Sequence, residues 1–334
     1  MRKKRVVLNH AGAEVANAGA FFNGSIARRL LANDLDVTKA LRTNTLLRKD
    51  EWIELDRALV DVARQRLQLI TDLRSMGLVH ALGGLGTLIS EYEQVTDMDD
   101  ANVDMSGVTE GEEDAPDFPL VGVPVPIHHK SFRVNIRKLA ASRKRGDGVD
   151  VTSITIAGRK VADSLEAMAL NGITGTLAGQ SMYGYRNHPD RNTGTAVGDF
   201  GTIGNIAMTV ANMVAAAEAD SFYGPYILYV AATQYGEMRS VYTDGSGQSA
   251  IIRILQSIPT IKQIKPCDQL TAGELLLVQM TRDVVDLAIA QDIVNVQWDE
   301  NGGMVERHKV FAAMAIRVKS DAEQKCGVVH YTGA

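Results

Sequence analysis

Three sets of residues have the types and spacing from which binding sites are built. Glycines recur at every third position just before a predicted helix, at Gly198, Gly201 and Gly204, where exposed backbone N–H groups can hold a phosphate. No Lys-Ser or Lys-Thr pair follows them and no strand directly precedes them, so the context of a P-loop or a dinucleotide-binding turn is missing. The glycines therefore do not predict a nucleotide site.

An acidic run that starts at Asp97 has the carboxylates that calcium prefers. A calcium loop needs a glycine at its sixth position and a glutamate at its twelfth, and this run has Asn102 and Val108 there. A solvated acidic loop is the better interpretation.

The neighbouring histidines His128 and His129 are candidate metal ligands. Successive side chains of a strand point to opposite faces, so the two cannot easily share one metal ion. No G-x-S-x-G nucleophile elbow occurs in the chain. We therefore predict no catalytic residue, no cofactor and no metal site, and this favours a structural protein over an enzyme.

The composition is that of a globular protein, but its charges are unevenly distributed. Of 334 residues, 45% are hydrophobic and 22% are charged, with a net charge of −5. Residues 1–49 contain ten Lys and Arg against three Asp and Glu, whereas residues 87–119 contain eleven Asp and Glu and no Lys or Arg. The two cysteines form no disulfide framework. Because no secretion signal and no apolar run of about 20 residues occurs, we expect a soluble, intracellular protein.

Two long amphipathic helices are predicted. In residues 51–76, and again in residues 150–172, apolar side chains recur every three or four positions and so line one face. Gly77 ends the first helix and Gly172 ends the second, since glycine accepts the left-handed conformation that closes a helix. We expect the second helix to be the element on which the others pack.

Between these helices the sequence predicts a two-stranded projection. Residues 87–95 and 120–127 read as strands, and the acidic stretch 98–117 forms the tip between them. Pro124 and Pro126 cannot donate to a strand ladder, so the second strand should lie at an edge. Proteins normally avoid a bare edge in a monomer, and burial against a neighbouring copy would resolve it.

The C-terminal half is predicted to alternate helix and strand after a loop at residues 172–201. The expected elements are a helix after Thr202, a strand at 226–231, helices at 233–241 and 248–255, strands at 258–264 and 275–280, and two long strands at 285–298 and 305–318 joined by a turn at Asn301-Gly302.

From about residue 50 to residue 332 the chain resembles, in ordered blocks, encapsulin-like members of the tailed-phage major-capsid (Hong Kong-97-type) fold family. The blocks that carry the resemblance are EWIELDRALVDVARQRL, FPLVGVPVPI, FRVNIRKLAASRKRGDGVDVTSITIAGRKVADSLEAMALNGITG, GPYILYVAATQY and ELLLVQMTRDVVDLAIAQDIVNVQW.

The fold class that this resemblance implies is α+β, with an N-terminal arm, an extension loop, a peripheral domain with a long spine helix, and an axial domain. The implied divisions are the arm at 1–49, the N-terminal helix region at 50–86, the extension loop at 87–130, the peripheral domain with the spine helix at 131–190, the axial domain at 191–284, and strands returning to the peripheral domain at 285–334.

The resemblance also implies self-association, as pentamers and hexamers of a closed icosahedral shell. The extension loop would lie across an adjacent subunit, and its expected contact residues are Glu91, Glu93, Val123, Pro124, Val125 and Pro126. The inner face of the N-terminal helix, near a cargo-peptide pocket in an encapsulin, would be Trp52, Leu55 and Leu59. Some related shells crosslink through a lysine of this loop. This chain has no lysine between Lys49 and Lys130, so we expect a non-covalent shell.

The first hypothesis is the major capsid protein of a tailed phage or prophage, assembled in the host cytoplasm into a virion capsid around non-specifically bound double-stranded DNA. The basic residues Arg2, Lys3, Lys4 and Arg5 would then face the DNA, with a solvated chain end as the equal alternative. Scaffold, portal or decoration proteins are further implied partners, whereas a membrane is not.

The second hypothesis is an encapsulin nanocompartment that encloses a cargo enzyme. The third is a soluble α+β enzyme with an unrecognised site.

Overall fold

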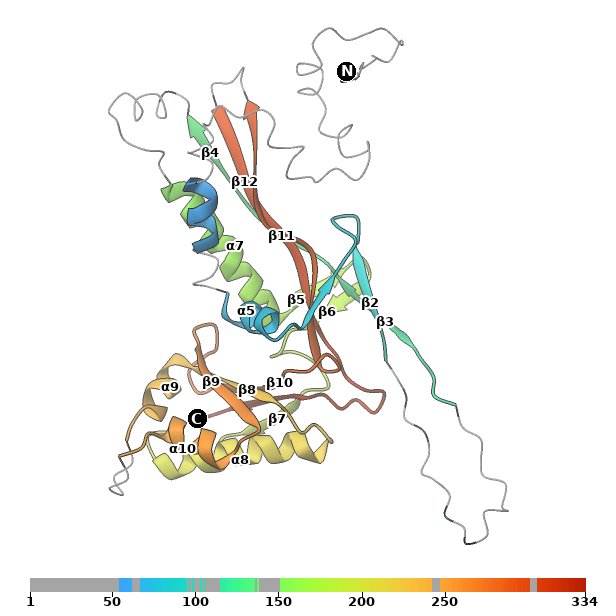
Figure 1. The fold of residues 1–334 in the computed structure, drawn as a ribbon, viewed down its shortest axis with the longest axis vertical. Coiled ribbons are helices and arrows are strands. Elements are labelled where there is room, and N and C mark those ends of the chain that lie inside the picture. The colour runs from blue at the N-terminus through green and yellow to red at the C-terminus, as the bar shows by residue number, and fades with distance from the viewer. Residues whose placement is uncertain are drawn as a thin grey trace, which may run out of the picture. The chain divides into compact units, whose positions relative to one another are not determined.

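The structure, a computed structural model, describes a large part of the chain (Figure 1). The described residues are 54–61, 67–94, 96, 98, 103, 105, 115–135, 137, 151–241, 247–300 and 305–334.

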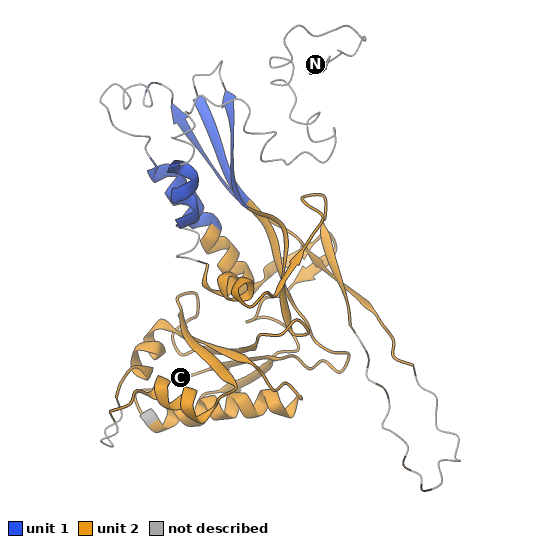
Figure 2. Cartoon of the chain, viewed as in Figure 1, with its two compact units in different colours: residues 1–62, 129–161, 293–311 blue, residues 63–128, 162–292, 312–334 orange. Residues whose placement is uncertain are grey.

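The chain divides into two compact units (Figure 2). Unit 1 comprises residues 1–62, 129–161 and 293–311, and unit 2 comprises residues 63–128, 162–292 and 312–334. The division falls within three elements, which are helix α7 (Thr152–Asn171) and the strands β11 (Val285–Glu300) and β12 (Val305–Val318). The long strands belong to a sheet of order β1-β11-β12-β4, whose outer members are β1 (Val79–Ala81) and β4 (Ile127–Asn135).

The helical residues 54–61 and helix α7 make a close contact in unit 1. Leu55 and Leu59, in the helical residues 54–61, are each 3% exposed. A Cβ atom added at Gly158 of α7 would lie 2.5 Å from the Leu59 side chain, so the glycine is what allows this approach.

On the strands of this unit, Phe132 stacks on buried His308 with ring centroids 4.7 Å apart, and burial lowers the pKa of His308 to about 4.

Unit 2 is built on a five-stranded sheet of order β7-β13-β10-β8-β9. Its strands are β7 (Asn192–Thr195), β13 (Val328–Thr332), β10 (Leu275–Gln279), β8 (Tyr226–Ala231) and β9 (Ile261–Cys267). The helices near this sheet are α8 (Ile203–Ala219), α9 (Ala232–Met238) and α10 (Ala250–Ser257) (Figure 1). One buried cluster joins helices and strands, and its largest members include Phe200, Ile206, Met213, Tyr226, Leu228, Ile254 and Leu277.

The inner strand β8, between β10 and β9, is buried at every position, because its second face is covered as well. Tyr229 on that face donates its hydroxyl to Asp72 of helix α5 (Gln68–Ser75) at 2.8 Å. The Lys265 ammonium lies 2.5 Å from the other oxygen of Asp72. A partnered carboxylate thus sits between α5 and the sheet, as a buried charge requires.

Glu166, one turn from the end of α7, is a second buried carboxyl in unit 2. It is 3% exposed, and its oxygens accept the backbone N–H groups of Leu69 and Ile70 at 3.2 and 3.3 Å, at the start of α5. Burial raises the pKa of Glu166 to about 8, and the charge of Asp72 adds to this, whereas the two N–H donors oppose it. Near neutral pH the folded chain therefore keeps a proton that the unfolded chain releases.

A pH-dependent stability follows from Glu166. Its pKa is higher in the folded chain than the ordinary 4.5, so its effect favours folding at acid pH and is lost as the pH rises from about 4.5 to about 8. We expect the melting temperature of the parent to fall over this range relative to that of Glu166→Gln, which keeps an acceptor for the N–H groups without a charge. Parallel thermal unfolding from pH 5 to pH 8 measures this difference, and parallel curves for the two proteins would contradict it.

The end of α7 is fixed by a close approach of two backbone segments. Gly172 has φ +63° and follows the last helical residue, as the sequence predicts. The N–H groups of Tyr185 and Arg186 donate to the carbonyls of Ala169 and Leu170 at 3.1 and 2.7 Å, which satisfies the unpaired end of the helix.

Gly184 lies inside this contact. A Cβ atom at Gly184 would come within 2.4 Å of the Gly172 nitrogen and 2.6 Å of the Leu170 carbonyl. A Cβ atom at Gly172 would come within 2.2 Å of the Met182 carbonyl oxygen. Both positions therefore require glycine.

Two sequence expectations need correction. The helix predicted at 51–76 is interrupted, since residues 54–61 are helical but Leu67 has φ −87° and ψ 81° before α5 begins at Gln68. The stretch 172–201 is more than a loop, because it holds β7 and a hairpin of β5 (Ile173–Leu177) and β6 (Gln180–Met182). Short strands without buried alternation, such as β5, leave no signal in the sequence.

The other predicted elements agree with the structure to within a few residues, whereas the strands β1, β4 and β13 had not been predicted. The strand predicted at 226–231 is β8, the long strands predicted at 285–298 and 305–318 are β11 and β12, and the helix after Thr202 is α8. The predicted turn at Asn301-Gly302 lies outside the described residues. None of the helices that the structure describes is long and apolar enough to cross a membrane.

Candidate functional site

The two strands of the predicted projection are present, whereas most of its predicted tip at 98–117 lies outside the described residues. We treat these strands and their base as the candidate site. Strand β2 (Ile89–Glu93) pairs antiparallel with β3 (Leu120–Pro124), in a register that places Glu93 opposite Leu120 and Ile89 opposite Pro124. The pairing continues toward the tip, because the N–H groups of Gln94 and Thr96 donate to the carbonyls of Pro119 and Asp117. A two-stranded ribbon of this kind is marginal alone and needs support on its faces.

One face of the ribbon is anchored to its own chain through Arg317 of β12. This side chain is 4% exposed and forms a bidentate ion pair with Asp286, with both N–O distances 2.5 Å. Its remaining Nη1 donates to the Ser90 hydroxyl at 3.1 Å and to the Glu91 carbonyl at 3.2 Å. Lys319 lies 3.0 Å from Asp286 and neutralises its charge further. The buried guanidinium thus joins the base of β2 to the strands β11 and β12 within unit 2.

Further contacts extend this anchor along the ribbon. The Gln94 amide donates to the carbonyls of Ser320 and Asp321 at 3.1 and 2.5 Å. The Lys319 ammonium lies 5.7 Å from the centre of the Tyr92 ring, within the range of a cation–π interaction. Residues at alternate positions of β2 therefore face the chain that follows β12.

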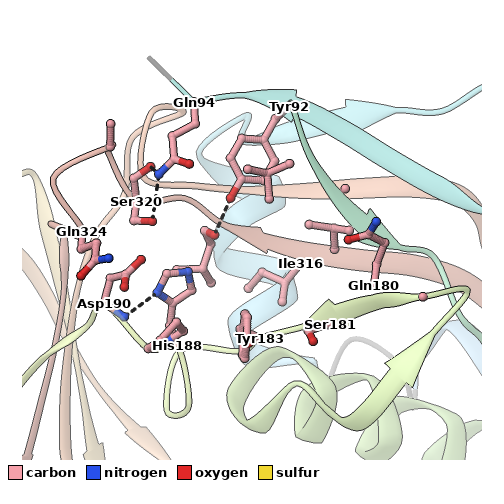
Figure 3. Close-up of a pocket in the computed structure, with 17 residues that line it drawn as sticks. Tyr92, Gln94, Gln180, Ser181, Tyr183, His188, Asp190, Ile316, Ser320 and Gln324 are labelled. Atoms are coloured by element: carbon pink, nitrogen blue, oxygen red, sulfur yellow. Dashed lines mark hydrogen bonds between the residues drawn. The ribbon is translucent and has the colours of Figure 1, made fainter. Parts of the chain in front are cut away.

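A pocket of about 450 Å³ adjoins this anchor (Figure 3). Its wall includes Gln94 of the ribbon, Ser320 after β12, Gln180 of β6, and the loop residues His188 and Asp190. His188 is buried and accepts the Asp190 N–H at 3.3 Å, and burial, its largest influence, lowers the pKa of His188 below 6.5. The ring is therefore a neutral packing and hydrogen-bonding group.

The lining of this pocket supplies no catalytic or metal-binding set. Its polar groups are mainly amides and hydroxyls, and within the described residues no three His, Cys, Asp or Glu side chains are grouped to hold a metal ion. The arrangement can accept hydrogen bonds from a polypeptide, but it contains no activated nucleophile.

The opposite face of the ribbon is open toward the tip, whereas nearer the base Gly122 lies against the Gln180 side chain of β6. Cross-strand partners lie on the same face of a ladder, so Glu93 and Leu120 share one face, together with Glu91 two residues before. All three side chains are exposed, and Leu120 is 64% exposed. Apolar exposure continues beyond the strand at Phe118.

The predicted contact residues differ in how much surface they offer. Glu91 and Glu93 are exposed, and Pro126 is half-buried. Val123 and Val125 are each only 8% exposed, and Pro124 is buried too, so they already pack within the chain. The exposed apolar surface lies at Leu120 and Phe118, which are not among the predicted contact residues.

The remaining predicted residues are buried or lie outside the described residues. Leu55 and Leu59 pack in unit 1, as described above. Trp52 and the basic residues Arg2, Lys3, Lys4 and Arg5 lie outside the described residues.

The anchor itself was missed. Arg317 and its partner Asp286 lie 31 positions apart in the chain, and Ser90 lies 227 positions from Arg317. The available signal in the sequence was that each of the two predicted long strands contains a charged residue among apolar ones, Asp286 in 285–298 and Arg317 in 305–318. A buried arginine among apolar neighbours requires a carboxylate partner.

Comparison with known proteins places this geometry in a family. A family model described as "Family of unknown function (DUF6260)" matches residues 40–331. The type 1 encapsulin shell protein EncA of Myxococcus xanthus is 22% identical over 283 aligned residues, and the match covers 82% of this chain and 90% of that protein.

Two solved structures have a similar fold. The virus-like particle from Pyrococcus furiosus superposes with a TM-score of 0.63 at 17% identity, covering 84% of this chain and 98% of that one. The capsid of Myoviridae phage XM1 gives a TM-score of 0.59 at 14% identity, covering 79% and 92%. The fold is therefore that of encapsulin-like, Hong Kong-97-type capsid proteins, as the sequence predicts, and the chain belongs to the DUF6260 family.

Proposed function

We propose that this protein is the subunit of a closed protein shell, and specifically the major capsid protein of a tailed phage or prophage whose head encloses double-stranded DNA. The observation that carries the proposal is the ribbon β2–β3, which is anchored to its own chain on one face and open on the other. The fold is shared with proteins named as shells and capsids, and that supports the same role here.

The open face explains why association with further copies is expected. Leu88, Phe118, Leu120 and Ile127, in and beside the ribbon, are each more than half exposed. Such a surface is costly in water and is typical of an interaction site. A contact that joins one copy's ribbon to a different surface of the next copy is heterologous, and it yields a closed assembly when the rotation between copies closes.

The charge of the N-terminal segment supports a DNA-filled shell. Residues 1–49 have ten basic and three acidic residues, and the family model begins only at residue 40. Cations that neutralise phosphates bind nucleic acid without sequence specificity. We propose that Arg2, Lys3, Lys4 and Arg5 contact the packaged DNA.

A nanocompartment that encloses a cargo enzyme is the second candidate, favoured by the similarity to an encapsulin shell protein over most of both chains. Leu55 and Leu59 are nearly fully buried, which leaves them little surface for a targeting peptide. In this candidate the basic segment has no essential role.

Removal of residues 1–49 tests between the two candidates. We expect purified particles of the full chain to carry nucleic acid, and the shortened chain to lose it or to fail to assemble. The ratio of absorbance at 260 and 280 nm of purified particles, with electron microscopy, measures both. Replacing Arg2, Lys3, Lys4 and Arg5 by Gln is the matched control for length. Normal, nucleic-acid-free shells from both the full and the shortened chain would favour the nanocompartment.

A further inference from the structure

The pocket of about 450 Å³ beside the ribbon anchor has polar side chains that its own chain leaves unused (Figure 3). Four lining side chains make no hydrogen bond or ion pair in the part of the chain that the structure describes, and they are Gln180, Ser181, Asp190 and Gln324. In the view of Figure 3, Asp190 and Gln324 lie on the left and Gln180 lies on the right. Such groups have hydrogen bonds to offer a ligand in place of water.

The walls of this pocket are held in place by contacts that do not use these four side chains. The Gln94 amide donates to the carbonyls of Ser320 and Asp321, which fixes the ribbon against the chain after β12. The N–H of Asp190 donates to the ring of His188, which fixes the loop on the other side. The pocket is therefore formed within unit 2, and a ligand would not have to order it.

An aromatic ring forms part of the wall. Tyr183 is 41% exposed, and its ring is held edge to face against His188 with the ring centroids 5.6 Å apart. An exposed aromatic ring offers apolar contact to the C–H groups of a ligand, and the hydroxyl at its end offers a hydrogen bond. The pocket thus combines a flat apolar surface with amides, hydroxyls and a carboxylate.

The charge of the lining disfavours an anionic ligand. Among the described residues that line the pocket, Asp190 is the only one with a charged side chain, since burial lowers the pKa of His188 and keeps it neutral. The Lys319 ammonium, next to Tyr92, pairs with Asp286 at 3.0 Å and does not line the pocket. A phosphate or carboxylate would meet an uncompensated negative charge, whereas a neutral polar ligand would not.

We propose that this pocket binds a neutral saccharide. The side chains of Gln180, Asp190 and Gln324 each present two polar atoms, and so match neighbouring hydroxyl groups on a sugar ring. The Tyr183 ring provides the apolar surface for the C–H groups of the same sugar. This binding activity goes beyond the proposed shell function and does not rest on it, because every lining residue belongs to unit 2 of one copy.

A polypeptide is the other neutral ligand with which amides pair. An extended peptide needs an open strand edge or a long groove. The pocket instead lies where β3 approaches β6, with Gly122 against the Gln180 side chain, and a Cβ atom there would lie 3.3 Å from Gln180 Cδ. A compact volume of about 450 Å³ suits a small ring-shaped ligand better than an extended chain.

Saturation-transfer difference NMR of the purified full chain tests the proposal with four neutral disaccharides, which are maltose, cellobiose, lactose and N,N′-diacetylchitobiose. We expect at least one of them to receive saturation from the protein and to bind with a millimolar dissociation constant, because hydrogen bonds exchanged for those of water give modest affinity. Gln180→Ala with Asp190→Ala should weaken this binding by about tenfold or more. Since neither side chain has a partner in the described chain, this variant should keep the melting temperature of the parent.

The matched control is Gln263→Ala with Asp268→Ala, at exposed positions in unit 2 that do not line the pocket, and it should bind as the parent does. Inorganic phosphate should not displace the bound disaccharide. Absence of saturation transfer to all four disaccharides would overturn the proposal, as would displacement by phosphate or equal binding by the folded pocket variant. Density for a polypeptide segment in the pocket, in a reconstruction of the assembled protein, would assign it to a protein partner instead. Because the test needs no particles, failure of the shell function would leave this proposal standing.

Discussion

Replacing Arg317 by Met is expected to lower the free energy of unfolding by about 3–5 kcal/mol, because it leaves the carboxylate of Asp286 buried without its main partner. Asp286 is 5% exposed, and in the variant only Lys319 remains near it. Ser90 and the Glu91 carbonyl lose their donor at the same time. Urea unfolding measures the loss, and an unchanged midpoint would contradict the role given to this ion pair.

A double variant separates stability from anchoring. Arg317→Met with Asp286→Leu replaces the ion pair by apolar side chains of similar size, and such replacements are often neutral in stability. We expect this protein to recover much of the lost stability but not the contact to Ser90, so its ribbon should be loosened. Faster chymotrypsin cleavage after Tyr92 or Leu120 of the ribbon than in the parent would report the loosening. Cleavage at the parental rate would mean that the guanidinium does not hold the ribbon.

Gly184→Ala is expected to cost more than about 3 kcal/mol or to prevent folding, because the new methyl group would overlap backbone atoms that cannot move as a side chain can. The nearest of these atoms, the Gly172 nitrogen and the Leu170 carbonyl, belong to the end of α7. The change would therefore break the helix-ending hydrogen bonds made by Tyr185 and Arg186. Thermal unfolding of the purified chain, or its recovery in the soluble fraction, measures the effect.

Gly204→Ala is the matched control for this prediction. Gly204 lies in α8, and a Cβ atom there meets nothing within 4 Å. Alanine is a better helix former than glycine, so this change should leave stability unchanged or raise it by up to about 1 kcal/mol. Equal stability of Gly184→Ala and Gly204→Ala would contradict the close backbone approach.

The parts of this fold that follow from local pattern could be predicted from the sequence. The helix predicted at 150–172 is α7, which spans Thr152–Asn171, because a repeat of three and four residues and a terminal glycine both act locally. The ribbon was predicted for the same reason, from two strand-like segments around an acidic stretch and from prolines that bar a central position.

The site residues depend on contacts between distant parts of the chain, and these leave little local signal. Arg317 reaches Ser90 across 227 positions, and Glu166 reaches Leu69 across 97. The need for glycine at position 184 arises only when the helix end is folded against it. Val123 and Val125 were expected at a subunit contact, yet their burial is decided by packing that a strand pattern does not reveal.

The most direct test of the shell function is sedimentation velocity with negative-stain electron microscopy of the full chain, expressed alone and then together with its neighbouring genes. If the protein is a shell subunit, we expect closed particles or open sheets tens of nanometres across, far larger than any small oligomer. A small, discrete oligomer that stays small in both expressions would contradict it.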